Sequence, residues 1–92
     1  MDKTIRVKYH HPSPHLWITN TYTNIQLNRV YYASIIHSIV GTYNADVQCS
    51  DGTEIESVHN TLRKAKSWVA KTLKKSINSG TEIRRRNKNT TP

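Results

Sequence analysis

Cysteine and phenylalanine are almost or wholly missing from this 92-residue sequence, which has one Cys and no Phe. The lone Cys49 excludes a disulfide within the chain and a zinc site built from several cysteines, and it is typical of a reducing compartment. No apolar run approaches the roughly 18 residues that a membrane span requires. Because Met1-Asp2-Lys3-Thr4 leads directly into an alternating segment, we expect no signal peptide and predict a soluble, cytoplasmic protein.

Acidic residues are also scarce, with six Asp and Glu against fourteen Lys and Arg and a net charge of +8 at pH 7. The imbalance lies in the C-terminal part of the chain. Residues 1–56 hold four bases and five acids, whereas residues 57–92 hold ten bases and a single acid, Glu82. Charge that is separated in this way points to a nucleic acid, a membrane surface or an acidic protein as the partner.

Hydrophobic residues make up only 35% of the chain, so its core must be small. A chain of this length forms one domain, which we place at residues 1–80. We interpret residues 81–92 as a basic, flexible C-terminal tail. Its three consecutive arginines would hold phosphates or acidic side chains if the tail were ordered: Arg84, Arg85 and Arg86.

The first half of the chain predicts strands. Apolar and basic residues alternate at positions 5–9, which indicates a strand that Pro12 and Pro14 should end. Residues 16–23 are rich in β-branched and aromatic side chains and predict a second strand. The segment 30–58 is the most β-like of the chain and is interrupted by two glycine turns, so we expect a meander of four to five strands.

The turn at Gly41 sets the register of the central hairpin. A glycine at the first position of a two-residue loop suits a type II′ turn, which would place Ile36 opposite Val47. In that register the outer face of the sheet gains an apolar patch. We interpret this patch as a contact surface, formed by Ile35, His37, Ile39 and Val58.

The next turn is decided by the hydrophobic pattern. A two-residue loop at Asp51-Gly52 would pair Val47 with Glu56 and bring a carboxylate into the core. A three-residue loop that ends at Gly52, in the left-handed region, pairs Val47 with Ile55 instead. The inner face of the sheet would then carry Tyr43, Ala45, Val47, Cys49 and Ile55.

The segment from Thr61 to Ile77 has apolar residues at helical spacing, and Gly80 supplies the left-handed position that ends many helices. The apolar stripe consists of Leu62, Ala65, Val69, Leu73 and Ile77, with Trp68 beside it. Such a stripe can cover the inner face of the sheet. We therefore predict the α+β class, with a small antiparallel sheet packed on one face by a single C-terminal helix.

The opposite side of this helix is basic, and its bases are Arg63, Lys64, Lys66, Lys71, Lys74 and Lys75. A cation in the first turns opposes the helix dipole and costs about 0.3 to 1 kcal/mol. No acid lies between Ser57 and Gly80, so the helix also lacks i, i+4 ion pairs, which contribute about 0.2 to 0.5 kcal/mol each. We interpret it as a surface for an anionic partner. In the competing interpretation the face is only solvated, and Lys74 and Lys75 complement the dipole.

The histidines and aromatic residues have structural explanations beside the functional ones. His10, His11 and His15 lie on an extended segment without neighbouring cysteines or carboxylates, so we favour exposed imidazoles in a turn over a metal site. The tyrosines and tryptophans would stack on nucleic-acid bases or, as we favour, fill the core of a domain that has no phenylalanine.

The sequence does not indicate catalysis. Asp46, Glu54 and Glu56 suit the solubility of exposed strands better than acid–base chemistry, and we interpret Cys49 as an inert core residue. A glycine-rich phosphate loop and a nucleophile elbow are both missing. We therefore expect a binding protein with no catalytic residue, no metal and no cofactor.

The segment DGTEIESVHNTLRKAKSWVAKTL, residues 51–73, follows a predicted strand and places a turn, a strand and a helix in succession. In size and layout, residues 30–78 resemble phage anti-CRISPR proteins directed at the type I-F surveillance complex. Those inhibitors share no binding motif, so no site residue is carried over. The resemblance implies a stoichiometric inhibitor in the bacterial host cytoplasm that docks where Cas subunits and guide RNA meet and blocks target DNA binding.

Three classes of partner remain open from the residues alone. The first is a protein or ribonucleoprotein complex, bound through the basic helix, the tail and the apolar patch. The second is free DNA or RNA, for which the chain would be a small basic regulator. The third is a second copy of the chain in a structural or dimerising protein, although we favour a monomer.

Overall fold

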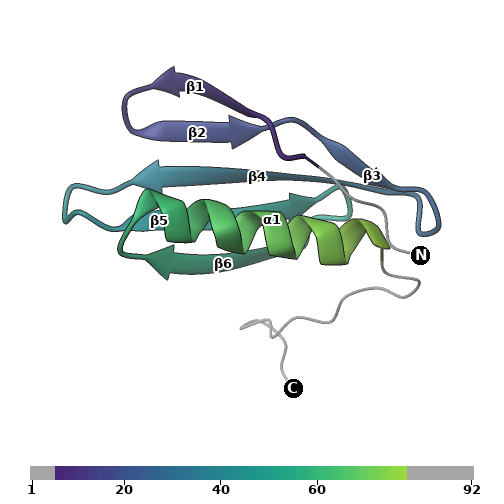
Figure 1. The fold of residues 1–92 in the computed structure, drawn as a ribbon. Coiled ribbons are helices and arrows are strands. Elements are labelled where there is room, and N and C mark those ends of the chain that lie inside the picture. Colours follow the sequence, from purple (N-terminus) through teal and green to yellow (C-terminus); the bar gives the residue numbers. More distant parts are fainter. Residues whose placement is uncertain (1–5, 79–92) are drawn as a thin grey trace.

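Six strands and one helix follow one another along residues 6–78, the part of the chain that the computed structural model describes. The strands form one antiparallel sheet, and the helix lies against one of its faces (Figure 1). This arrangement confirms the predicted α+β class. The elements are β1 (Tyr9–Ser13), β2 (Leu16–Thr19), β3 (Tyr22–Asn24), β4 (Arg29–His37), β5 (Tyr43–Cys49), β6 (Glu54–His59) and α1 (Leu62–Asn78).

The sheet has the order β1-β2-β4-β5-β6, and β3 pairs with β4 on the same edge as β2. The single strand predicted at residues 16–23 is thus two strands, β2 and β3. For this reason the sheet has six strands within residues 6–78, where four to five were predicted. The interruption lies at Asn20 and Thr21. Next to it, the Ala33 amide donates to the Thr19 hydroxyl at 2.9 Å, so a side chain replaces the missing ladder partner.

The first strand differs from the prediction. Instead of ending before the prolines, β1 begins at Tyr9 and runs through Pro12. β1 lies at one edge of the sheet. Pro12 has no amide proton, and at an edge this need not remove a hydrogen bond to a neighbouring strand. The register shifts between His10 and Ser13, at the proline.

The hairpin between β4 and β5 has a three-residue loop, Ile39 to Gly41, and the predicted two-residue turn is wrong. The Ser38 amide donates to the Thr42 carbonyl at 2.8 Å, and the Gly41 amide donates to the Ser38 carbonyl at 3.0 Å. Gly41 is the third loop residue and has a φ of +94°. A left-handed glycine in this position is typical of three-residue hairpin loops.

The longer loop changes which side chains of β4 face the helix. Ala33 lies opposite Val47, where the prediction had Ile36. The register differs by three residues, and because an odd shift exchanges the two faces of a strand, Ile35 turns inward and Ile36 turns outward. Ile35 is consequently fully buried, with 0% of its surface exposed.

The hairpin between β5 and β6 agrees with its prediction. Val47 lies opposite Ile55, and Gly52 has a φ of +92° at the third loop position. The Cys49 amide donates to the Thr53 carbonyl and the Gly52 amide donates to the Cys49 carbonyl, both at about 3 Å. The two hairpins therefore share one loop geometry, and in both a threonine follows the glycine.

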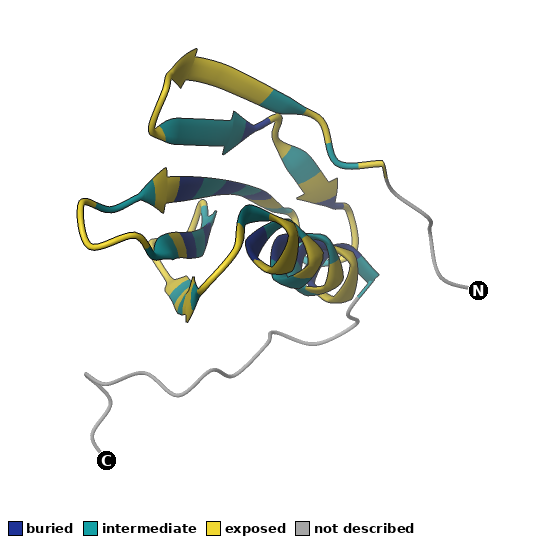
Figure 2. Cartoon of the chain, turned by 60° about the vertical axis from the view of Figure 1, so that its left-hand side comes forward, coloured by how far each residue is buried: buried dark blue, intermediate teal, exposed yellow. Residues whose placement is uncertain are grey.

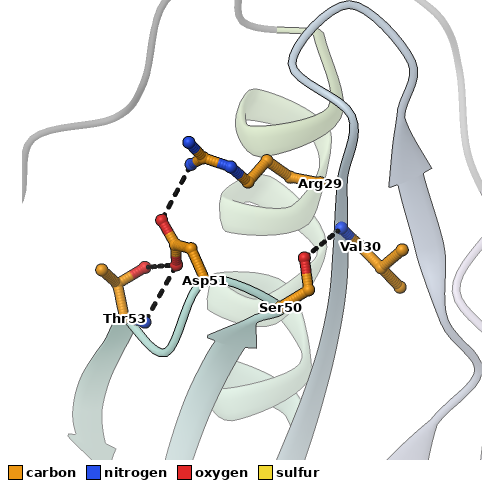
Figure 3. A network of polar contacts seen from close by, with 5 residues as sticks. All are labelled: Arg29, Val30, Ser50, Asp51 and Thr53. Carbon is orange, nitrogen blue, oxygen red and sulfur yellow. Dashed lines mark hydrogen bonds and ion pairs between the residues drawn. The ribbon is translucent and has the colours of Figure 1, made fainter.

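Polar contacts fix the second loop to the start of β4 (Figure 3). Arg29 forms an ion pair with Asp51 at 2.8 Å, and the other carboxylate oxygen of Asp51 accepts from the amide and hydroxyl of Thr53. The Ser50 hydroxyl accepts from the Val30 amide at 3.1 Å. These contacts use Arg29, the first residue of β4, which is remote in sequence from α1.

The core lies between α1 and the helix-side face of the sheet. Figure 2 shows buried residues on the side of α1 that faces β4 and β5 and exposed residues on its other side. The predicted stripe is confirmed, although Leu62 at its start is only half-buried. Cys49 is also only half-buried. The buried hydrophobic residues are Tyr31, Ala33, Ile35, Ala45, Val47, Ala65, Val69, Leu73 and Ile77.

Side-chain hydrogen bonds stabilise both ends of α1. The Lys64 amide donates to the Thr61 hydroxyl at 3.1 Å, which makes Thr61 the N-cap. Near the C-terminal end, the buried Asn24 of β3 donates to the Ser76 carbonyl at 2.7 Å and accepts from the Leu27 amide. The helix is thereby held against the sheet at a fixed rotation about its axis.

The loop geometry of the first hairpin is testable at Gly41. An added Cβ would meet no atom within 4 Å, so a substitution there changes only the backbone preference. We expect Gly41→Ala to lower the free energy of unfolding by about 1 to 2 kcal/mol and Gly41→Asn by less, because asparagine tolerates the left-handed region. Urea unfolding measures both values.

Gly52, which has the same geometry, provides the control and should give the same ranking. A type II′ turn calls for glycine itself at its first position. Equal losses for the alanine and asparagine variants of Gly41, with unequal losses at Gly52, would contradict the three-residue loop.

Candidate functional site

The outward side of α1 presents most of its basic side chains to solvent. We define the basic face of α1 by its five exposed cations: Arg63, Lys64, Lys71, Lys74 and Lys75. The helix has 17 residues and so extends over roughly 25 Å. Because the apolar stripe is buried on the opposite side, the rotation that builds the core also turns these five charges outward.

Within residues 6–78, no carboxylate lies close enough to pair with the basic face. The ion pair found in this part of the chain joins Arg29 to Asp51, neither of which belongs to α1. The first turn of α1 contains no acid, so Arg63 and Lys64 lie beside the positive end of the dipole without compensation. Among residues 6–78, the charge of the basic face therefore has no partner of opposite sign.

The strand carboxylates lie on the other side of the sheet. Asp46 alternates with the buried Ala45 and Val47, and its register partner on β6 is Glu56. The Ser34 hydroxyl donates to Asp46 at 2.9 Å. Glu54 occupies the same face, opposite Gln48. The sheet thus separates an acidic outer face from a basic helix.

The sixth base of the helix, Lys66, is placed differently from the other five. It is half-buried on the flank of α1, and its ammonium lies 4.9 Å from the centre of the Tyr9 ring on β1. This is within the range of a cation–π interaction. Lys66 therefore joins the basic helix to the strand at the far edge of the sheet.

The predicted apolar patch is not formed, because the register of β4 differs from the prediction. Ile35 belongs to the core, and His37 lies on the helix-side face, where its ring stacks on Tyr43 at 4.2 Å. Ile39 is fully exposed, but in the hairpin loop rather than on a strand. Val58 is on the outer face as predicted, with 64% of its surface exposed.

The outer face has an apolar row of its own. In register across the sheet, Leu16 lies opposite Ile36, Ile36 opposite Asn44, and Asn44 opposite Val58. Ile36 is 49% exposed. Ile36 was not among the predicted contact residues, because only the correct register of the first hairpin places it on this face.

Histidine and aromatic rings gather on the helix-side face, a grouping that the sequence did not indicate. His11 stacks on Trp17 with ring centres 4.6 Å apart, Trp17 contacts Tyr43 at 6.1 Å, and His37 lies 5.9 Å from His15. The stacked pair of His37 and Tyr43 joins these contacts into one series. We call these five residues the ring row.

The described residues show no cluster of three or more His, Cys, Asp or Glu side chains able to hold a metal ion. The first two histidines have other contacts: His10 Nε2 lies 2.8 Å from the Asn20 side-chain oxygen, and His11 Nδ1 lies 3.0 Å from the Leu16 carbonyl oxygen. A second ring pair, His59 and Trp68, joins β6 to α1 at 5.9 Å.

Two tyrosines have perturbed acidity. Burial raises the pKa of Tyr9 to about 12, and nearby Tyr22 acts in the same direction. The Tyr9 hydroxyl is buried and makes no hydrogen bond within the described residues. The pKa of Tyr31 is also raised to about 12, first by burial and then by Cys49. In both cases the environment favours the neutral phenol.

The predicted tail arginines, Arg84, Arg85 and Arg86, lie outside the described residues, as does the boundary expected at residue 80. In the described part of the chain, the helix is not long and apolar enough to cross a membrane. Comparisons of the chain with family models, curated proteins and solved structures found no match. The resemblance to anti-CRISPR proteins therefore remains a prediction.

The raised pKa of Tyr9 predicts how stability depends on alkaline pH. The folded state keeps the phenol proton to higher pH than the unfolded state, so this contribution is fully present below pH 10 and is lost as the pH rises through about 12. We expect Tyr9→Phe to flatten the decline between pH 10 and 12 in urea unfolding. An unchanged decline would contradict the burial of this hydroxyl.

Proposed function

We propose that this protein is a non-enzymatic binding protein whose basic face lies along the phosphate backbone of a nucleic acid. The observation that carries the proposal is the row of five exposed cations on one rigid helix, none with a carboxylate partner within residues 6–78. Lysines act as point charges, which suit phosphates better than the bidentate reading of base edges. Binding would therefore depend little on sequence.

The position of the charges supports this function over simple solubility. Arg63 and Lys64 occupy the first turn, where each cation costs about 0.3 to 1 kcal/mol against the dipole. The same charges become favourable when a phosphate approaches, because the helix N-terminus and the side chains then attract one anion together. A helix that served only solubility would gain from glutamate at these two positions.

From the resemblance to anti-CRISPR proteins, we propose that this nucleic acid is part of the type I-F complex of a bacterial host, which contains a guide RNA. The outer face supports docking on a protein subunit as well, since it exposes Ile36 and Val58 on the side of the sheet opposite α1. The hairpin loop adds two further exposed side chains, Ile39 and Val40. In this proposal one surface meets RNA and the other meets protein.

The alternative is a small regulator that binds free DNA or RNA. It is favoured by the absence of acids from the first turn and by a basic face that is complete without any protein partner. Capture of bacterial proteins from a lysate that persists after nuclease treatment would favour docking on a ribonucleoprotein. Capture of nucleic acid alone would favour the regulator.

Salt dependence tests the contact between α1 and phosphates. If the five cations of the basic face each neutralise one phosphate of duplex DNA, the logarithm of the affinity should fall with the logarithm of salt concentration at a slope of about −4.5. Fluorescence anisotropy with a labelled oligonucleotide measures the slope. A slope close to zero would contradict backbone binding.

Reversing the first-turn charges should separate stability from binding. We expect Arg63→Glu combined with Lys64→Glu to raise the free energy of unfolding by about 0.3 to 1 kcal/mol per site. The same variant should weaken nucleic-acid binding and reduce the salt slope to about −2.7, since two phosphate contacts are lost.

Arg6→Glu combined with Lys8→Glu is the matched control, because both residues are exposed in the segment before β1 and lie outside the basic face. Its charge change is the same as that of the double variant on α1, so it measures the effect of net charge alone. Loss of stability in the double variant, or equal loss of affinity in the double variant and the control, would contradict the proposed role of the basic face.

A further inference from the structure

The ring row crosses the sheet at the end where the hairpin between β4 and β5 turns. His11 comes from β1, Trp17 from β2, Tyr43 from β5 and His37 from β4, and His15 lies in the turn just before β2. Successive ring centres are between 4.2 and 6.1 Å apart. Five rings from separate parts of the chain thus form one continuous series.

Trp17 and Tyr43 pack against the core, but none of the five rings is buried in it. Tyr31 is the buried aromatic residue of the described core, whereas Trp17, Tyr43 and His37 are half-buried and both ends of the row are exposed. The backbone of α1 lies close to β3, β4, β5 and β6 but not to β1 or β2, and the contact with β1 is made by the long side chain of Lys66. The row therefore extends past the part of the sheet that α1 covers.

The charge next to the ring row is positive. Lys66 lies over Tyr9, which is on the same strand and the same face as His11, two residues earlier. The exposed Arg63 lies one helical turn before Lys66. The carboxylates of the described strands are all on the opposite face of the sheet. A ligand on the ring row would meet cations from α1 and no strand carboxylate.

We infer that the ring row is a stacking surface for the bases of single-stranded nucleic acid. This inference rests on the proposed function, in which α1 holds the phosphates. Rings on a sheet beside a row of cations combine the two requirements for binding a single strand, a stacking platform and an electrostatic track for the backbone. His11 and His15 are the two exposed ends of the ring row, and a base that stacks on either one would extend the row by one ring.

The ring row also predicts selectivity for strandedness. In a duplex the base faces are already stacked on one another and are not accessible to side chains. Stacking of a free base on an aromatic side chain contributes about 1 to 3 kcal/mol. The protein should therefore bind a single strand more tightly than a duplex, although α1 alone would favour the duplex because its phosphate charge is denser.

The test compares labelled single-stranded and duplex oligonucleotides of about 12 nucleotides or base pairs, a length within the range of single-strand binding sites. We expect the single strand to bind the wild-type protein more tightly. His11→Ala combined with His15→Ala should weaken single-strand binding about tenfold or more and leave duplex binding unchanged. Both histidines are exposed, so these changes leave the core intact.

His10→Ala is the matched control, because His10 is the neighbouring histidine on β1 but lies opposite Ile18 on the other face of the sheet. It should bind both oligonucleotides as the wild type does. Trp68→Phe leaves Trp17 as the single tryptophan of the chain. In that variant, a single strand should quench the tryptophan emission and a duplex should not.

Failure of this inference can be distinguished from failure of the proposed function. Equal affinity for the two oligonucleotides, unaffected by His11→Ala and His15→Ala but reduced by Lys71→Glu, would overturn the ring row and retain the basic face. Binding that Lys71→Glu and Arg63→Glu leave unchanged would overturn the proposed function. No binding of either oligonucleotide at low salt would overturn both.

Discussion

The burial of one helical stripe against one face of the sheet determines the rest of this structure. Ala65, Val69 and Leu73 lose all exposed surface against β4 and β5, whose contact positions include Ala33 and Ala45. The alanines let the helix lie close to the strands, where larger side chains would hold it away. Because the helix cannot rotate without exposing this stripe, the position of every charge on α1 follows from its packing.

The helix and its basic face could be predicted from the sequence, because both depend on local periodicity. The apolar stripe at helical spacing and the glycine beyond its end lie within 20 residues of each other. The β5–β6 hairpin was also predictable, since the wrong register would have buried Glu56. In each case a single polar or apolar position was enough to exclude the alternative.

The β4–β5 hairpin could not be placed in the same way. The strand β4 is apolar on both faces, with Ile35 and Ile36 adjacent, so either register buries an isoleucine and the pattern does not choose between them. The Gly-Thr pair at 41–42, which repeats the pair at 52–53, was the available signal. The ring row depends on this register and on two strands near the N-terminus, so local sequence could not reveal it.

Under the proposed function, the rotation of α1 that its buried stripe fixes turns its cations toward a nucleic acid. A single-stranded oligonucleotide with a terminal spin label can test this orientation, because the label broadens the NMR signals of nearby amides. We expect strong broadening at Arg63, Lys71 and Lys74 of α1 and little at Asp46 and Glu56. Broadening concentrated at Asp46 and Glu56, with α1 unaffected, would contradict it.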